Sequence, residues 1–159
     1  MANPLRVGAL IFILAFVLNG VWEVLQVSWY SGEHASVLET FVHCLPAIVI
    51  DSRFILALYA LFLRSGERSI PHLTLPKLLL LSLVSVVTAT AIEVLAISLG
   101  WWDYRASMPR VPVLGVGLLP VLQLGLLSPL TFVLLRALLK LGGREVGKPT
   151  LDSLPRYSP

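Results

Sequence analysis

Four long apolar runs dominate the chain, and shorter segments containing proline, glycine and charged residues separate them. The runs cover approximately residues 7–27, 38–63, 78–99 and 113–138. A helix needs about 20 residues at 1.5 Å each to cross the hydrocarbon core of a bilayer. Every backbone polar group in lipid also needs a partner within the protein, which favours helices. We therefore predict an all-α integral membrane bundle of four transmembrane helices in residues 1–141, followed by a polar cytoplasmic tail over 142–159.

The composition agrees with a protein whose solvent is lipid. Hydrophobic residues make up 57% of the chain and charged residues 13%, whereas a soluble domain has about 25% charged residues. The mean hydropathy is +0.86. No basic cluster is interleaved with aromatic residues in a polar context, so nucleic-acid binding is not expected. The single cysteine, Cys44, excludes an internal disulfide and is interpreted as a packing residue.

The distribution of lysine and arginine predicts the orientation in the cell membrane. The side that carries both termini contains Arg6, Arg64, Arg68, Lys77, Arg136, Lys140, Arg144, Lys148 and Arg156. The opposite side carries only Arg105 and Arg110. Because short cytoplasmic loops are enriched in these residues, we expect a multi-pass protein with both termini in the cytoplasm.

Two segments of the chain are similar. "EVLQVSWY" at residues 23–30 matches "EVLAISLGWWDY" at 93–104 in its Glu, Val, Leu and Ser, and a Trp and a Tyr follow in both. The following helices match more weakly, as "LPAIVID" from Leu45 against "LPVLQLG" from Leu119. This pattern predicts two tandem duplicated helical hairpins related by an axis along the membrane normal. The aromatic residues that close both segments are expected at the outer interface: Trp29, Tyr30, Trp101, Trp102 and Tyr104.

Polar residues inside the spans are the candidate functional groups, because an ionisable group near the bilayer centre costs about 2.5–3.5 kcal/mol. In the first span Asn19, Glu23 and Gln26 fall on one helical face, with Trp22 at its border. Glu93 lies in the third span and Gln123 in the fourth. We expect such residues to line a shared interior pocket.

The second span adds further polar residues. Glu39 and His43 lie one turn apart on one face, and Asp51 lies deeper beyond Pro46, which is expected to kink the helix. Arg53 lies roughly 200° around the helix from Asp51, so the two do not easily share a face. Most of these polar residues fall in the half of the membrane away from the cytoplasm. The sequence therefore predicts a one-sided polar pocket rather than a through-pore.

We assign provisional roles to these residues. Glu23 and Glu93 are the expected acid and base, and His43 and Asp51 are further catalytic candidates. The candidate substrate-binding residues are Asn19, Trp22, Gln26, Glu39, Trp102, Tyr104 and Gln123. The alternative is structural: the acids and amides hold helices together by hydrogen bonds, Asp51 pairs with an arginine, and the aromatics form an interfacial belt.

Neither a metal nor a cofactor is expected. His43, Glu23, Glu93 and Asp51 could supply four ligands on paper. The chain has no His-x-x-x-His, Glu-x-x-His or cysteine pair, however, and metal-binding helices usually show such spacing.

Residues 93–120, in which Glu93 is followed by "GWWDY", a proline-containing turn and another helix, resemble membrane carotenoid-modifying proteins of the lycopene cyclase and carotenoid hydratase types. The resemblance implies acidic residues near aromatic motifs on polytopic helices. The chain departs from the cyclase pattern after Pro120, where "VLQ" replaces a paired-acid motif, and this puts a cyclase activity in doubt. The His and Glu content is also similar to that of small membrane sterol-isomerase-like proteins, without a shared motif. These likenesses do not assign the chain to a family.

Three functions therefore stay open. The first is a membrane-embedded enzyme that acts by proton transfer on a lipid-like or isoprenoid substrate. The second is a binding or transport component, which with four helices would need to form a homodimer. The third is a structural subunit whose polar face on the first helix docks a partner membrane protein.

Overall fold

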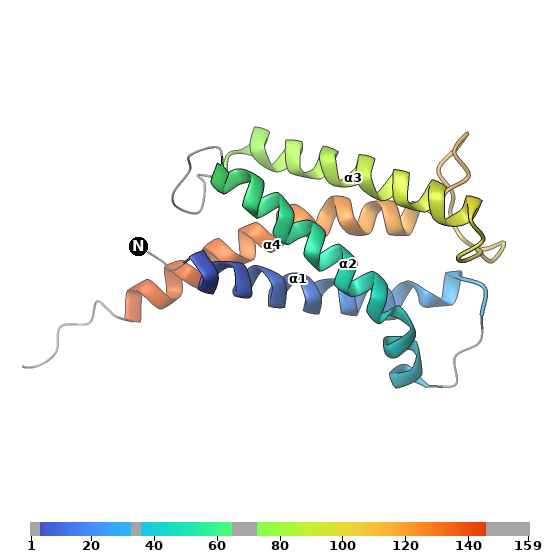
Figure 1. Cartoon of the computed structure of the whole chain (residues 1–159), viewed down its shortest axis with the longest axis horizontal. Helices are drawn as coiled ribbons and strands as arrows, with labels where there is room; N and C mark the ends of the chain where they lie inside the picture. Colours follow the sequence, from blue (N-terminus) through green and yellow to red (C-terminus); the bar gives the residue numbers. More distant parts are fainter. Residues whose placement is uncertain (1–3, 33–35, 65–72, 146–159) are drawn as a thin grey trace, which may run out of the picture.

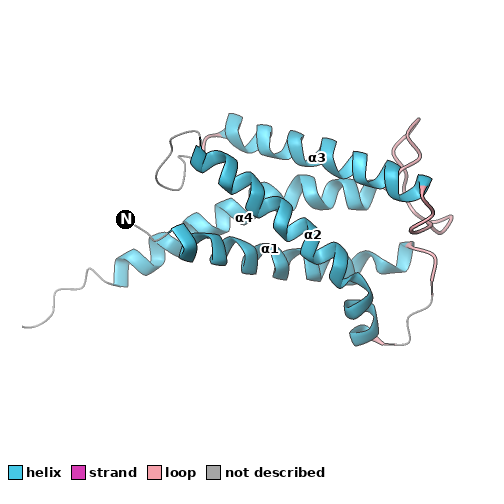
Figure 2. Ribbon diagram, viewed as in Figure 1, coloured by secondary structure: helices cyan, strands magenta, loops and turns pink. Residues whose placement is uncertain are grey.

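The chain forms four long helices in a computed structural model that describes residues 4–32, 36–64 and 73–145 (Figures 1 and 2). They are α1 (Pro4–Gln26), α2 (Val37–Arg64), α3 (Leu75–Ser98) and α4 (Leu118–Glu145), and a short 3₁₀ helix, η1 (Val27–Trp29), extends α1. Each long helix, α1 together with η1, provides a stretch of 24 to 26 residues that is apolar enough to cross a membrane. The predicted all-helical fold with four membrane-spanning-type helices is confirmed at this level.

Helix α4 is the central element of the bundle. It packs against both α1 and α3, whereas α2 packs mainly against α1. Within the most apolar part of α4, 56% of the residues are buried, compared with 22% for α3. The apolar core joins all four helices and includes Ile11, Ile55, Leu81, Phe132 and Leu135. Residues on α4 can therefore reach groups on both neighbouring helices.

The packing is not symmetric between the two hairpins. An axis that exchanges them would require an α2–α3 interface equivalent to the α1–α4 interface, yet α2 and α3 make at most marginal contact. Helices α1 and α3 do share a burial register, because Ile11 and Ala15 in the first match Leu81 and Ser85 in the second. The duplication stays a prediction, and α2 and α4 have different packing environments.

The fourth helix differs from the predicted span of 113–138. It begins at Leu118, because the preceding segment forms a tight loop in which Val113 and Gly115 both have a φ of 71°. Val111 N–H donates to the Val116 carbonyl at 2.8 Å within this loop. The helix then continues to Glu145, into the segment expected to be a tail, and residues 146–159 lie outside the described part of the chain.

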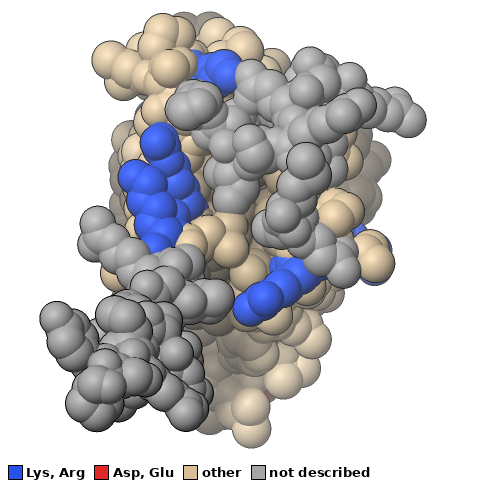
Figure 3. All heavy atoms as spheres, turned by 90° about the vertical axis from the view of Figure 1, so that its left-hand side faces the viewer, with Lys and Arg blue, Asp and Glu red and all other residues tan. Residues whose placement is uncertain are grey.

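Two features distinguish the ends of the bundle. The first turns of α2 bend away from the other helices (Figure 1), in agreement with the position of Pro46 inside this helix. Lysine and arginine side chains gather at the end where α1 begins and α4 finishes (Figure 3). The described cations that the topology brings to this end are Arg6, Lys77, Arg136 and Lys140.

Candidate functional site

A buried polar cluster lies between α1, α2 and α4, near the end of the bundle opposite the basic end. Its centre is the side-chain amide of Gln123, whose Nε2 lies 3.0 Å from Asn19 Oδ1 and 3.0 Å from Glu23 Oε1. The same nitrogen lies 3.1 Å from Asp51 Oδ2. One side chain of the central helix thus gathers polar groups from two other helices.

The amide oxygen of Gln123 also has a hydrogen-bond partner. Gln26 Nε2 donates to Gln123 Oε1 at 2.7 Å, and Trp22 Nε1 donates to Gln26 Oε1 at 2.9 Å. Asn19 Nδ2 donates back to the Ala15 carbonyl at 2.8 Å. Asn19, Gln26 and Gln123 are between 0% and 3% exposed. The amides therefore form a fixed, water-excluded scaffold that positions the carboxyl groups.

If both acids are ionised, the amide nitrogen of Gln123 has fewer hydrogens than the acceptors around it. A side-chain NH₂ group supplies two hydrogens, whereas three oxygen acceptors surround this one. The carboxyl oxygens of Glu23 and Asp51 also lie at most about 6 Å apart, because both are within 3.1 Å of the same nitrogen; carboxyl groups in this range interact strongly. The missing donor can be a proton held between Glu23 and Asp51, or a hydrogen-bond donor on a ligand.

Glu93 on α3 has a different set of partners. It is 5% exposed and accepts hydrogen bonds from Trp102 Nε1, at 3.3 Å, and from the Tyr104 hydroxyl. Burial and the hydrogen bond to Glu93 raise the pKa of the Tyr104 phenol above its ordinary value. The proton of this phenol is therefore held firmly against the Glu93 carboxyl group.

The turn after α3 explains how these aromatics reach Glu93. Leu99 caps the helix, and Gly100 follows with a φ of 68°. Trp101 N–H donates to the Ala96 carbonyl at 2.9 Å and Gly100 N–H to the Ile97 carbonyl at 3.0 Å, which is a Schellman motif. Glycine adopts this left-handed conformation without strain. The chain reverses there, so that the residues nine and eleven positions after Glu93 return to it.

The two similar segments of the sequence meet over this acid. Tyr30 and Tyr104 form an isolated antiparallel bridge, and their rings lie 5.4 Å apart between centroids. Ser31 N–H donates to the Asp103 carbonyl at 2.8 Å. Arg105 fixes the pairing, because its guanidinium donates to the carbonyls of Tyr30 and Gly32 at 3.0 and 2.9 Å. We call Tyr30, Trp102 and Tyr104 the aromatic cap.

The two acid sites are electrostatically linked. Asp51 interacts with both Glu23 and Glu93, and Glu93 interacts with Glu23. The charge on Glu93 and, above all, burial raise the pKa of Tyr30, which lies just outside the spans. A change of charge at one carboxyl group is therefore felt by the other two.

The structure gathers most of the residues that the sequence singled out, but not all of them. Asn19, Trp22, Glu23, Gln26, Asp51 and Gln123 form one connected cluster, and Trp102 and Tyr104 contact Glu93. Glu39, His43 and Arg53 are exposed on α2.

Sequence reasoning missed three features of the site. It did not place Asp51 beside Glu23, where the Gln123 amide holds both acids. It treated Cys44 as packing alone, although the charge of Glu23 also acts on this buried thiol. It placed Tyr30 in an interfacial belt and did not predict that Tyr30 pairs with Tyr104 over Glu93. A glutamine in an otherwise apolar span was the signal for the first of these features, since such an amide needs several polar partners.

Within the described ranges, no group of three or more His, Cys, Asp or Glu side chains has the arrangement of a metal site. A comparison of the chain with protein-family models, curated proteins and solved structures finds no match.

Proposed function

We propose that this protein is a multi-pass membrane enzyme that transfers protons to and from a lipid-like, isoprenoid-type substrate at its buried acid cluster. The observation that supports this proposal is the imbalance at Gln123, where one NH₂ group faces three acceptors and two of them are carboxyl oxygens. A proton held by this pair leaves one neutral acid and one base in the same water-excluded site. Such a pair can supply both the acid and the base of general acid–base catalysis.

The proposed reaction is a double-bond shift. The neutral member of the Glu23–Asp51 pair gives its proton to one carbon of a C=C bond, and a cation forms on the neighbouring carbon. The ionised member removes a proton from the adjacent C–H, whose electron pair forms the new double bond. One proton enters and one leaves, so no oxidant or other co-reactant is needed. Aromatic faces near the site, such as Trp22, stabilise the cation.

Burial of the cluster within one chain favours this function over a docking role. Asn19 and Gln26, on the polar face of α1, are buried and hydrogen-bonded to Gln123 of α4. A partner protein would have to displace these bonds. The basic end of the bundle supports the cell-membrane orientation with both termini in the cytoplasm, which puts the acid cluster in the outer half of the bilayer.

Solvent deuterium tests the proposal. The full chain is reconstituted in liposomes that contain polyprenyl alcohols and linear polyenes, in D₂O, and mass spectrometry follows deuterium entering the lipids. We expect incorporation with the wild-type protein, and a loss of about 10²-fold or more for Glu23→Gln or Asp51→Asn. Asp103→Asn is the matched control, because Asp103 is an exposed loop acid, and it should keep wild-type incorporation.

The outcomes separate the candidate functions. Equal incorporation by the wild type and both acid variants overturns the proposal. Lipid-dependent proton flux across the liposome membrane without incorporation indicates the alternative, a transport component that uses the same acids.

A further inference from the structure

Arg53 is a charged residue on the surface of a membrane-spanning-type helix. It lies in α2, eight residues before the end of the apolar stretch Val37–Leu61, and it is exposed. It makes neither a hydrogen bond nor an ion pair with any residue in the part of the chain that the structure describes. The other described basic residues of the candidate spans lie closer to a span end: Arg6, Lys77, Arg136 and Lys140. With α2 in a bilayer, the Arg53 charge faces hydrocarbon, which is costly unless a partner covers it.

The depth of Arg53 places it out of reach of lipid phosphate groups. Eight residues correspond to about 12 Å along the helix, which exceeds the length of an extended arginine side chain. The Cα–Cβ bond of a helical residue also tilts toward the helix N-terminus. The Arg53 side chain therefore starts toward the more distant end of the span, sixteen residues away at Val37. Snorkelling to a headgroup is disfavoured, so the partner has to lie within the hydrocarbon.

A second copy of this chain is a poor partner for Arg53. A two-fold axis along the membrane normal sets both copies of Arg53 at the same depth, where their like charges repel each other. The described acids deep within the spans already have hydrogen-bond partners inside the bundle: Glu23, Asp51 and Glu93. Asp51 lies two residues before Arg53 but on the opposite side of α2. The missing negative charge therefore has to come from another molecule.

The surface around Arg53 suits a transmembrane helix. Ile50, Ala57 and Ala60 lie within about 60° of Arg53 around α2, and all three are exposed. Ala57 and Ala60 are small, and small residues let helices approach each other closely in a membrane. We call Ile50, Arg53, Ala57 and Ala60 the Arg53 face. Its shape admits a helix, and its charge selects an acidic one.

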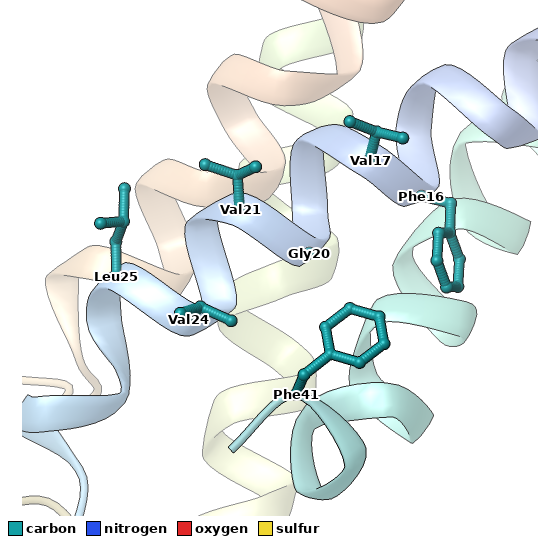
Figure 4. Close-up of a pocket in the computed structure, with 7 residues that line it drawn as sticks. All are labelled: Phe16, Val17, Gly20, Val21, Val24, Leu25 and Phe41. Atoms are coloured by element: carbon teal, nitrogen blue, oxygen red, sulfur yellow. The ribbon is translucent and has the colours of Figure 1, made fainter. Parts of the chain in front are cut away.

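The apolar groove between α1 and the start of α2 differs from the Arg53 face (Figure 4). Phe16, Gly20 and Val24 line it from α1, Phe41 lines it from α2, and no charged residue of the described ranges does so. Lipid chains are as apolar as such a wall. The bilayer can therefore cover the groove, whereas it cannot satisfy Arg53.

From these observations we propose that the Arg53 face docks a transmembrane helix of another protein, and that an aspartate or glutamate near the middle of that helix pairs with the Arg53 guanidinium. A guanidinium and a carboxylate can form two parallel hydrogen bonds. Each charge then removes the exposure of the other to hydrocarbon. This surface is separate from the polar face of α1, which is buried within the chain. The inference goes beyond the proposed function and does not depend on it.

Binding of designed transmembrane peptides tests the proposal with the full chain. The protein is reconstituted in phosphatidylcholine liposomes with a donor dye at its N-terminus, and energy transfer to an acceptor-labelled peptide reports association. The probes are leucine-rich peptides of about 21 residues, long enough to cross the bilayer, with Glu, Leu or Lys at the central position. We expect the Glu peptide to bind roughly tenfold more tightly than the Leu peptide, which corresponds to about 1.4 kcal/mol. The Lys peptide should bind no better than the Leu peptide.

Variants of the protein assign this preference to Arg53. Arg53→Leu should remove the preference for the Glu peptide, and Arg53→Glu should transfer it to the Lys peptide. Arg6→Leu is the matched control, because Arg6 is an exposed arginine at the beginning of α1, and it should keep the preference. Deuterium incorporation should be unchanged in Arg53→Leu, since Arg53 makes no hydrogen bond or ion pair with the acid cluster.

Four results would overturn the inference. Equal binding of the Glu and Leu peptides, or a Glu preference that survives Arg53→Leu, would show that Arg53 does not select an acid. Energy transfer between two labelled copies of the protein that is lost in Arg53→Leu would make a second copy the occupant. A Glu preference that phosphatidylglycerol abolishes would make a lipid phosphate the occupant. A retained Glu preference without deuterium incorporation would remove the proposed function and leave this inference standing.

Discussion

Glu23 and Glu93 occupy equivalent places in two similar segments, yet the structure surrounds them differently. Glu23 accepts a hydrogen bond from the amide of another helix and lies beside a second acid, Asp51. Glu93 accepts hydrogen bonds from a phenol and an indole that follow it in its own segment. The first acid is held by tertiary packing and the second by local chain reversal. Their different neighbours suit them to different tasks.

The lengths of the two segments account for the difference. In the first, Trp29 and Tyr30 follow Glu23 by six and seven residues, and η1 carries the chain onward. In the second, the longer segment contains Gly100, whose left-handed conformation turns the chain back to Glu93. Helix α4 then lies beside α1 and supplies Gln123 to the first acid. The longer segment after Glu93 thus supplies this acid with partners of its own.

The largest expected effect is on stability, and it concerns the cluster in which helix packing holds Glu23 beside Asp51. We call this cluster the tertiary site. Gln123→Leu removes the donor to two carboxyl groups and the acceptor of Gln26, so several buried groups lose a partner. We expect a loss of about 3–5 kcal/mol in the free energy of unfolding, the range for breaking buried polar pairs. Unfolding of the purified protein in mixed micelles, followed by helix content, measures it.

The control for this variant removes the acids as well. Combining Gln123→Leu with Glu23→Leu and Asp51→Leu leaves no uncompensated carboxyl group, so most of the stability should return. A loss of less than about 1 kcal/mol for Gln123→Leu alone would show that the amide does not hold the acids together.

A smaller loss of stability is expected at the local site, in which Glu93 is held by Trp102 and Tyr104 of its own segment. Tyr104→Phe removes one hydrogen bond to Glu93 and keeps the ring, and Trp102 still donates to the acid. We expect a loss of about 1.5–3 kcal/mol, typical of hydrogen bonds to charged groups. Tyr30→Phe, in the same aromatic cap, is the matched control and should cost less. Equal losses in the two variants would contradict the assigned role of the Tyr104 hydroxyl.

The sequence was sufficient for the helices and for most members of the site. Long apolar runs can bury their backbone polar groups only as helices, so the spans followed from length. Polar residues in those runs had to face inward, which correctly grouped Asn19, Glu23 and Gln26. The start of α4 was predicted too early, because the apolar residues around Val113 hide a loop with positive φ angles.

The pairing of the acids was beyond the sequence because it depends on which helices are neighbours. Helix α4 packs against both α1 and α3 and offers Gln123 to Glu23. Asp51 joins the pair through the packing of α2 on α1. His43, by contrast, is exposed near the bend of α2, whose direction could not be read from Pro46 alone.

A smaller effect is expected at the edge of the tertiary site. Trp22→Phe removes the indole N–H that donates to Gln26 Oε1 at 2.9 Å and keeps an aromatic ring in place. Since Gln26 still donates to Gln123, we expect a loss of about 0.5–1.5 kcal/mol. The same unfolding measurement applies, and Trp101→Phe, at an exposed position, is the control. A loss as large as that of Gln123→Leu would mean that Trp22, and not the amide, organises the cluster.

The Tyr104 phenol should make the stability of the protein depend on pH, with no effect at neutral pH. The pKa of Tyr104 is raised above its ordinary value of 10.0, first by burial and then by the hydrogen bond to Glu93. Above about pH 10 the unfolded chain therefore loses this proton while the folded protein keeps it, so the unfolded state binds fewer protons and stability falls as pH rises. Tyrosinate absorbance, taken as the difference between wild type and Tyr104→Phe, should show one phenol that titrates late. If that phenol titrates at its ordinary value in the wild type, Glu93 is not held by a buried hydroxyl group, and the contrast between the two acids is lost.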